Sequence, residues 1–176
     1  MRGAIWLVGM MGAGKSTVGA RLAQRLGRPF VDSDALICAR AGKQIAEIFE
    51  HDGESAFRAL EAEVVERAGE DGAVVALGGG AAAQPGAAGR LAARGTLVYL
   101  RARPETLLER IGDPGSRPLL AGLGVAERLA RIEALLAERE PAYASARVIV
   151  DVDEWDEAAV AEQVAAMLDS LEQESR

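Results

Sequence analysis

The chain has 176 residues, a length typical of one domain that can bury a hydrophobic core. Its hydrophobic fraction of 49% is typical of a soluble globular protein, and its net charge of −7 argues against a general nucleic-acid binder, which needs a basic surface. The only cysteine, Cys38, excludes an intrachain disulfide, favours a cytoplasmic protein and is expected to be a buried small hydrophobe. We expect neither a signal peptide, because the first predicted strand starts soon after Met1, nor a membrane span.

The first predicted strand, residues 4–8, leads into a glycine loop and a helix. Residues 9–17, GMMGAGKST, fit the pattern GxxxxGKS, whose glycines let backbone N–H groups surround a phosphate. We call these residues the phosphate loop. The Lys15 ammonium is expected to bridge the terminal phosphates, and the Ser16 hydroxyl to bind a magnesium ion. A chance glycine loop is disfavoured, because a strand precedes the motif and an amphipathic helix follows it.

Two carboxylates follow the second predicted strand, residues 29–31. Asp32 and Asp34 are candidates for supporting the magnesium and for contacting a substrate hydroxyl, since an extended segment would place both on one side. Ser33 or Asp34 is also expected to cap the next helix. Apolar residues then recur at helical spacing at residues 35–50 and 54–68, which predicts helices, with Gly42 and Gly53 as breaks.

Strands and helices alternate through the rest of the chain. The pattern predicts strands at 73–77, 96–100 and 147–150, and helices at 86–94, 104–110, 125–139 and 157–171. Five strands alternating with helices indicate an α/β fold, a three-layer sandwich with a five-stranded parallel sheet whose ligands bind at the carboxyl ends of the strands. We expect a single domain over residues 1–176, with turn residues at about 111–124 forming a mobile lid.

Two further features lie where predicted strands end. Asp151 follows an apolar strand, but we interpret it as part of an acidic patch at a helix start, where carboxylates act as caps. Gly78, Gly79 and Gly80, the glycine triplet, follow the strand at 73–77 and would let a ligand lie against bare backbone. A simple turn is the alternative, but the triplet is expected at the same edge of the sheet as the phosphate loop.

The order and spacing of these motifs closely resemble the shikimate kinase family. The resemblance rests on the phosphate loop, the Asp32 and Asp34 pair, Phe57-Arg58 with Glu61, the glycine triplet, Arg117-Pro-Leu-Leu120, and Glu138-Arg139 before Pro141 and Tyr143. It extends from residue 5 to about residue 150. It implies a kinase of the P-loop type, with a mobile lid, that transfers the γ-phosphate of ATP to the 3-hydroxyl of shikimate in aromatic amino acid biosynthesis.

The resemblance also implies a role for each site residue. The ATP-binding residues would be Gly12, Ala13, Gly14, Lys15, Ser16, Thr17, Arg110 and Arg117. One Mg²⁺ per subunit would be bound by Ser16 directly and by Asp32 through water. Shikimate would be bound by Asp34, Arg58, Gly79, Gly80 and Arg139, with Arg58 and Arg139 on its carboxylate. The catalytic residues would be Lys15, Asp34 and Arg117, the last closing from the lid onto the phosphates.

Some alternatives stay open at this point. Asp34 would act either as a general base or only as a positioning group, and Arg110 would either lie along the adenine or be a solvated surface residue. A kinase for gluconate or a nucleoside monophosphate would share the phosphate loop and the fold, and a catalytically silent nucleotide-binding module is a third class. The absence of asparagine from the chain disfavours a GTPase. We expect a cytoplasmic monomer that binds ATP and shikimate, and neither nucleic acid nor membrane.

Overall fold

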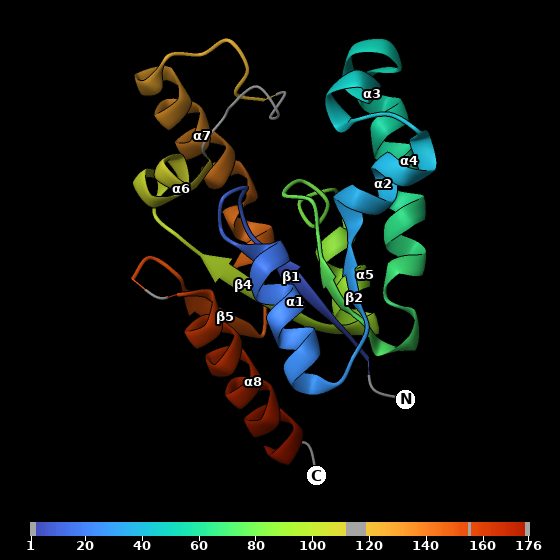
Figure 1. Ribbon diagram of the computed structural model, residues 1–176, viewed down its shortest axis with the longest axis vertical. Helices are drawn as coiled ribbons and strands as arrows, with labels where there is room; N and C mark the ends of the chain where they lie inside the picture. The colour runs from blue at the N-terminus through green and yellow to red at the C-terminus, as the bar shows by residue number, and fades with distance from the viewer. Residues whose placement is uncertain (1–2, 112–118, 155, 175–176) are drawn as a thin grey trace.

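The computed structural model describes residues 3–111, 119–154 and 156–174 (Figure 1). Its centre is a five-stranded sheet with the order β2-β3-β1-β4-β5, in which every neighbouring pair is parallel. The strands are β1 (Ala4–Val8), β2 (Phe30–Asp32), β3 (Val74–Ala76), β4 (Gly95–Arg101) and β5 (Val148–Asp151). The predicted α/β fold with a five-stranded parallel sheet is confirmed.

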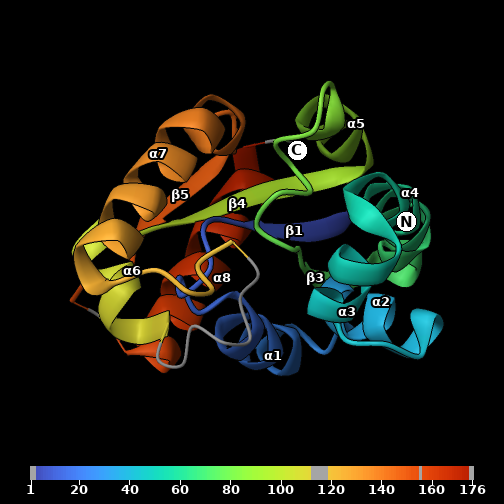
Figure 2. The same cartoon turned by 90° about the horizontal axis from the view of Figure 1, so that it is seen from above.

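Helices cover both faces of this sheet. Figure 2 shows α5 and α7 on one side of the strands and α1 and α8 on the other, and α1 packs along α8. The helices are α1 (Lys15–Leu26), α2 (Ser33–Ala41), α3 (Ile45–His51), α4 (Gly53–Ala68), α5 (Ala87–Arg94), α6 (Pro104–Ile111), α7 (Val125–Tyr143) and α8 (Glu157–Glu174), with a short 3-10 turn at Glu70–Gly72. Three layers result, as the alternation of strands and helices predicts.

The core has a large and a small part. All five residues of β1 are buried between the two helical layers, which explains why its sequence is an unbroken apolar run. A separate small cluster, Ile37, Ile48, Phe57 and Val64, holds α2, α3 and α4 together beside β2. These three helices therefore form a packed unit of their own at one edge of the sheet, and α2 and α4 carry Asp34 and Arg58.

Gly42 interrupts the stretch 35–50, as predicted: it adopts a left-handed φ of 65° and its N–H closes α2 on the Cys38 carbonyl, so α2 and α3 are separate helices. Other local predictions are wrong in detail. Cys38 is half-buried, where a buried side chain was expected. The cap of α2 is Asp32, neither Ser33 nor Asp34, because the helix begins at Ser33, two residues before the predicted start near Ala35. No helix in the described ranges is long and apolar enough to cross a membrane.

Candidate active site

The predicted site residues converge at the carboxyl ends of β1, β2 and β3. In the sheet, β3 lies between β2 and β1, and Asp32 at the end of β2 is in register with Ala76 at the end of β3. Ala76 is likewise in register with Leu7, just before the phosphate loop. The phosphate loop, Asp32 and the glycine triplet therefore meet at the carboxyl ends of the strands, as expected for a parallel sheet.

The phosphate loop follows β1 directly and opens α1. Its backbone depends on glycine at two close approaches: a Cβ on Gly9 would lie 2.5 Å from the Leu100 carbonyl oxygen, and one on Gly12 would lie 2.9 Å from the Leu107 carbonyl oxygen. Both also have left-handed φ values, 141° and 83°. The Lys15 ammonium donates hydrogen bonds to the carbonyls of Gly9 and Met10, both 2.9 Å long, which hold it over the loop.

Ser16 and Asp32 are joined across the site. The Ser16 hydroxyl donates to Asp32 Oδ2 at 2.5 Å, and Asp32 Oδ1 accepts from the backbone N–H groups of Asp34 and Ala35 at 3.0 and 3.1 Å. One carboxylate oxygen thus caps α2 while the other faces Ser16. The Asp32 carboxylate is fixed before any ligand arrives.

A cavity of about 530 Å³ lies over the phosphate loop. We call it the phosphate-loop cavity; it is lined by Met11, Gly12, Gly14, Lys15, Ser16, Thr17, Asp32, Asp34, Ala76, Leu77, Gly79, Arg110 and Glu157. Arg110 donates to the carbonyls of Val152 and Asp153 at 2.7 and 3.3 Å, which ties it to the segment between β5 and α8 at the cavity wall. Ala13 is buried, and its N–H donates to the Met10 carbonyl at 3.2 Å.

The donors in this cavity suit a magnesium ion that is bound mainly by phosphate. No group of three or more histidine, cysteine, aspartate or glutamate residues within the described ranges could hold a metal ion by itself. Mg²⁺ in kinases commonly takes one or two oxygens from the protein and the rest from phosphates and water. The hydrogen-bonded oxygens of Ser16 and Asp32, both lining the cavity beside Lys15, fit that requirement.

A second cavity, of about 100 Å³, adjoins the first. We call it the arginine pocket; it is lined by Met11, Asp34, Ile45, Phe49, Phe57, Arg58, Glu61, Gly78, Gly79, Gly80, Leu119 and Arg139. Met11, Asp34 and Gly79 line both cavities. A molecule in the arginine pocket would therefore meet a molecule in the phosphate-loop cavity beside the Asp34 carboxylate.

Each residue of the glycine triplet lies against a different charged side chain. A Cβ on Gly78 would lie 2.5 Å from Asp34 Oδ1, and one on Gly79 would lie 3.2 Å from Arg139 Nη1. A Cβ on Gly80 would lie 2.8 Å from Arg58 Nη1. The bare backbone thus leaves room for three predicted substrate-binding side chains, and a turn without a function does not require this.

Arg58 is held by a buried carboxylate. Its Nη1 donates to Glu61 Oε2 at 2.7 Å, one turn further along α4, and its guanidinium lies 5.1 Å from the centre of the Phe57 ring. Glu61 is 3% exposed. Burial raises the pKa of the Glu61 carboxyl and outweighs the lowering by Arg58, while Asp34 raises it further and Arg139 lowers it. The pocket thus places two guanidinium groups beside two carboxylates.

Arg139 reaches the pocket from α7. It is 6% exposed, and its Nη1 lies 3.8 Å from the Met10 sulfur. Tyr143, one turn later in the same helix, is fully buried, and its hydroxyl donates to the carbonyl of Gly79. Helix α7 extends four residues beyond the predicted end at 139, with Pro141 inside it, and this extension brings Tyr143 to the glycine triplet.

The structure adds contacts that sequence reasoning missed. Ser33, fully buried between the two aspartates, accepts a 2.9 Å hydrogen bond from the Gly78 N–H. The extended spacing predicted for Asp32 and Asp34 is wrong, because Ser33 begins α2; the two carboxylates still line the phosphate-loop cavity together. Arg117 and the lid residues 112–118 lie outside the described residues.

Asp151 is absent from both cavities. Its carboxylate forms a two-point ion pair with Arg101, with distances of 2.5 and 2.9 Å, and this pair lowers the pKa of Asp151. Asp156, in the same acidic stretch, accepts from the Ala159 N–H at 2.7 Å and caps α8. Asp156 thus caps the helix as predicted for the acidic stretch, whereas Asp151 forms an ion pair that the sequence analysis did not predict.

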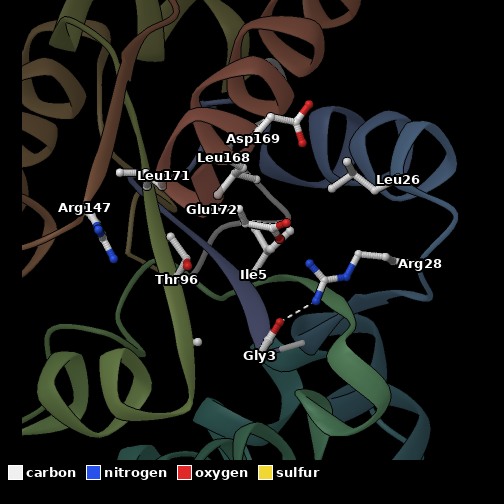
Figure 3. A pocket seen from close by; sticks show the side chains of 11 residues that line it. Gly3, Ile5, Leu26, Arg28, Thr96, Arg147, Leu168, Asp169, Leu171 and Glu172 are labelled. Atoms are coloured by element: carbon white, nitrogen blue, oxygen red, sulfur yellow. Dashed lines mark hydrogen bonds between the residues drawn. The ribbon is translucent and has the colours of Figure 1, made fainter. Parts of the chain in front are cut away.

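A further cavity, of about 410 Å³, lies at the amino ends of the strands, where β1 and β4 begin (Figure 3). Its floor is apolar, with Ile5, Leu26 and Leu168, and Arg28 donates across it to the Gly3 carbonyl. The phosphate loop and the glycine triplet follow the other ends of the strands, so this cavity is separate from the predicted site.

Comparisons with known proteins bear on the family. A model of the shikimate kinase family matches residues 11–169. The chain belongs to the shikimate kinase family. A shikimate kinase of Halorhodospira halophila is 50% identical over 149 residues, which are 84% of this chain and 81% of the relative. The shikimate kinase from Acinetobacter baumannii, solved in complex with shikimate, has a TM-score of 0.90 and 36% identity, over 97% of this chain and 94% of that one.

A gluconokinase from Sinorhizobium meliloti has a TM-score of 0.57 at 21% identity, over 97% of this chain and 95% of that one, a likeness of fold alone. The resemblance drawn from the motifs is thus confirmed, and with it the prediction of an ATP-dependent kinase of the shikimate kinase type with the P-loop kinase fold. Membership of this family also separates the chain from silent nucleotide-binding modules.

Proposed function

We propose that this chain transfers the γ-phosphate of ATP to the 3-hydroxyl of shikimate, giving shikimate 3-phosphate and ADP for aromatic amino acid biosynthesis. The observation that carries the proposal is the junction of the phosphate-loop cavity and the arginine pocket at Asp34. Lys15 lies on one side of this junction and the two arginines, Arg58 and Arg139, on the other. The arrangement suits a phosphate donor and a carboxylic acid acceptor.

On the donor side, ATP would occupy the phosphate loop, from Gly12 to Thr17. Lys15, which contacts the Gly9 and Met10 carbonyls, would exchange them for the charged terminal phosphates. Ser16 would bind Mg²⁺ directly and Asp32 would support it through water, and that ion would neutralise charge on the phosphates. Arg110 at the cavity wall would lie along the adenine, and Arg117 would close from the lid onto the phosphates.

On the acceptor side, Arg58 and Arg139 would hold the shikimate carboxylate, because a guanidinium offers a planar pair of donors. The buried Glu61 would keep the Arg58 fork in place before substrate arrives. The Gly79 and Gly80 backbone would lie against the ring. Asp34 would orient the attacking hydroxyl, and accept its proton if the reaction needs a base. Phosphoryl transfer needs mainly such positioning and charge stabilisation.

We further propose that the protein is a cytoplasmic monomer with small-molecule substrates. The acidic net charge of −7 and the single half-buried cysteine support this setting. The functional test is a coupled ADP-release assay with Mg²⁺ and ATP, with shikimate, gluconate and nucleoside monophosphates as acceptors. Of these acceptors, we expect only shikimate to support turnover.

An Arg139→Lys variant tests the carboxylate clamp in the same assay. Lysine keeps the charge but loses the planar fork, so the KM for shikimate should rise roughly tenfold or more. Arg147→Lys, in the cavity at the amino ends of the strands, is the control and should leave the KM for shikimate unchanged. Turnover with gluconate and none with shikimate would identify the alternative kinase; no turnover with any acceptor while ATP still binds would contradict the proposal.

A further inference from the structure

Tyr143 connects three segments of the proposed active site through one hydroxyl group. Its side chain is fully buried at the end of α7. The hydroxyl donates a hydrogen bond to the Gly79 carbonyl and lies 3.9 Å from the Met10 sulfur. It thereby links α7 to the glycine triplet and to the phosphate loop.

The same three segments hold Arg139. Tyr143 and Arg139 are four residues apart in α7, so their side chains lie on one face of the helix. Arg139 Nη1 also lies near the Met10 sulfur, at 3.8 Å, and 3.2 Å from where a Cβ of Gly79 would be. The Tyr143 hydroxyl therefore fixes the distance between the glycine triplet and the helix that carries one of the two pocket arginines.

The hydroxyl stays a donor across the usual range of assay pH. Burial raises the pKa of Tyr143 to about 12, although the nearby Arg139 guanidinium lowers it. A neutral phenol can donate its proton to the Gly79 carbonyl, and the carbonyl can only accept. Removal of this one oxygen would leave that carbonyl without the donor that the structure gives it.

The Tyr143 ring has a separate structural role. It packs against the ring of Tyr99, with centroids 5.2 Å apart and planes inclined by 40°. Tyr99 is also buried, at 1% exposure, and its hydroxyl donates to Glu140 Oε2 at 2.7 Å. Tyr99 lines neither the phosphate-loop cavity nor the arginine pocket. The two tyrosines thus have similar burial and ring packing, but only the Tyr143 hydroxyl bonds to the glycine triplet.

We propose that Tyr143 is a positioning residue for the acceptor. Its hydroxyl holds the Gly79 carbonyl, and so keeps the glycine triplet in contact with the Arg139 and Arg58 side chains that would bind the acceptor. This inference rests on the proposed function of the arginine pocket. It predicts that loss of the hydroxyl weakens the use of shikimate more than the use of ATP.

The test is a comparison of Tyr143→Phe with Tyr99→Phe, which remove the same atom from neighbouring rings. In Tyr143→Phe the KM for shikimate should rise about five- to tenfold, the effect of one lost hydrogen bond, while the KM for ATP stays within about twofold. Tyr99→Phe should keep both KM values. Thermal unfolding is measured for both variants. Both should lose stability, whereas the KM for shikimate should rise only in Tyr143→Phe.

Hydrogen exchange supplies a readout that does not depend on activity. Backbone amides of residues 77–84 should exchange faster in Tyr143→Phe than in the wild type, and Tyr99→Phe should match the wild type there. An unchanged KM for shikimate in Tyr143→Phe, or equal rises in both variants, would overturn the inference while leaving the proposed function intact. A wild type without shikimate turnover would overturn both.

Discussion

Gly80→Ala offers a sharp test of the arginine pocket, because it adds one methyl group against one functional side chain. The new Cβ would lie 2.8 Å from Arg58 Nη1, 3.0 Å from Nη2 and 3.2 Å from Cζ. Gly80 does not have a left-handed φ, so alanine fits its backbone conformation. The methyl would therefore act through Arg58 and not through backbone strain.

The size of the effect follows from the Arg58 contacts. Nη1 must move by about 0.6 Å to reach the 3.4 Å of ordinary contact. Its hydrogen bond to Glu61 Oε2 is now 2.7 Å, and a shift of this size along the bond would stretch it beyond the ~3.2 Å of a good N–H···O bond. We expect a KM for shikimate about tenfold higher, equivalent to about 1.4 kcal/mol.

The assay pairs initial rates with thermal unfolding. The stretched bond also weakens the partner of the buried Glu61 carboxyl, so the free energy of unfolding should fall by about 1 kcal/mol, which leaves the domain folded. Gly89→Ala in α5 is the matched control: its Cβ would meet nothing within 4 Å, and it should leave KM unchanged while adding about 0.5–1 kcal/mol of stability. A Gly80→Ala enzyme with the wild-type KM for shikimate would refute the assignment of Arg58 to the carboxylate.

Two further substitutions separate charge from structure. Asp32→Asn should keep the cap of α2, since asparagine caps a helix as well as aspartate does. In a magnesium titration, the Mg²⁺ concentration for half-maximal rate should rise about tenfold. An unchanged titration would contradict the metal role of Asp32. Glu61→Gln tests the buried carboxyl of Glu61, whose pKa burial raises above 4.5. The folded wild type therefore holds this proton more tightly than the unfolded chain does, and the stability of the wild type falls as pH rises above 4.5. In urea unfolding from about pH 4.5 to 7.5, the wild type should lose stability relative to Glu61→Gln, whereas the exposed Glu63→Gln should follow the wild type.

Much of the fold could be predicted because β1 and β3, and most of β4, are buried on both faces. These strands appear in the sequence as apolar runs and the helices as patterns of period 3.6, whereas the short, half-exposed β2 is indicated only by Phe30 and Val31. The errors fall where a single backbone conformation decides the outcome. Residues 32–34 were predicted to be extended, but the chain turns helical at Ser33, and apolar spacing cannot indicate that φ angle. The α7 extension through Pro141 was missed for a similar reason, since proline usually marks a boundary.

The site was predictable where its residues are close in the chain. Lys15 and Ser16 sit in one loop whose spacing fixes their geometry. The contacts that assemble the acceptor side join distant residues: the Ser33 to Gly78 bond spans 45 positions and the Tyr143 to Gly79 bond spans 64. Alternation of strands and helices predicts a parallel sheet but leaves the order of its strands open. Contacts of this kind depend on that order.

The strand order also explains why larger residues in the triplet would displace charged side chains. Because β3 lies between β1 and β2, its end is flanked by the phosphate loop on one side and by α2 with Asp34 on the other. Side chains from α2, α4 and α7 then converge on three consecutive residues, and each glycine faces one of them: Asp34, Arg139 and Arg58. A sheet with β3 at its edge would leave this backbone open on one side and tolerate larger residues there. The triplet therefore follows from the interior position of β3, because its backbone lines both the phosphate-loop cavity and the arginine pocket.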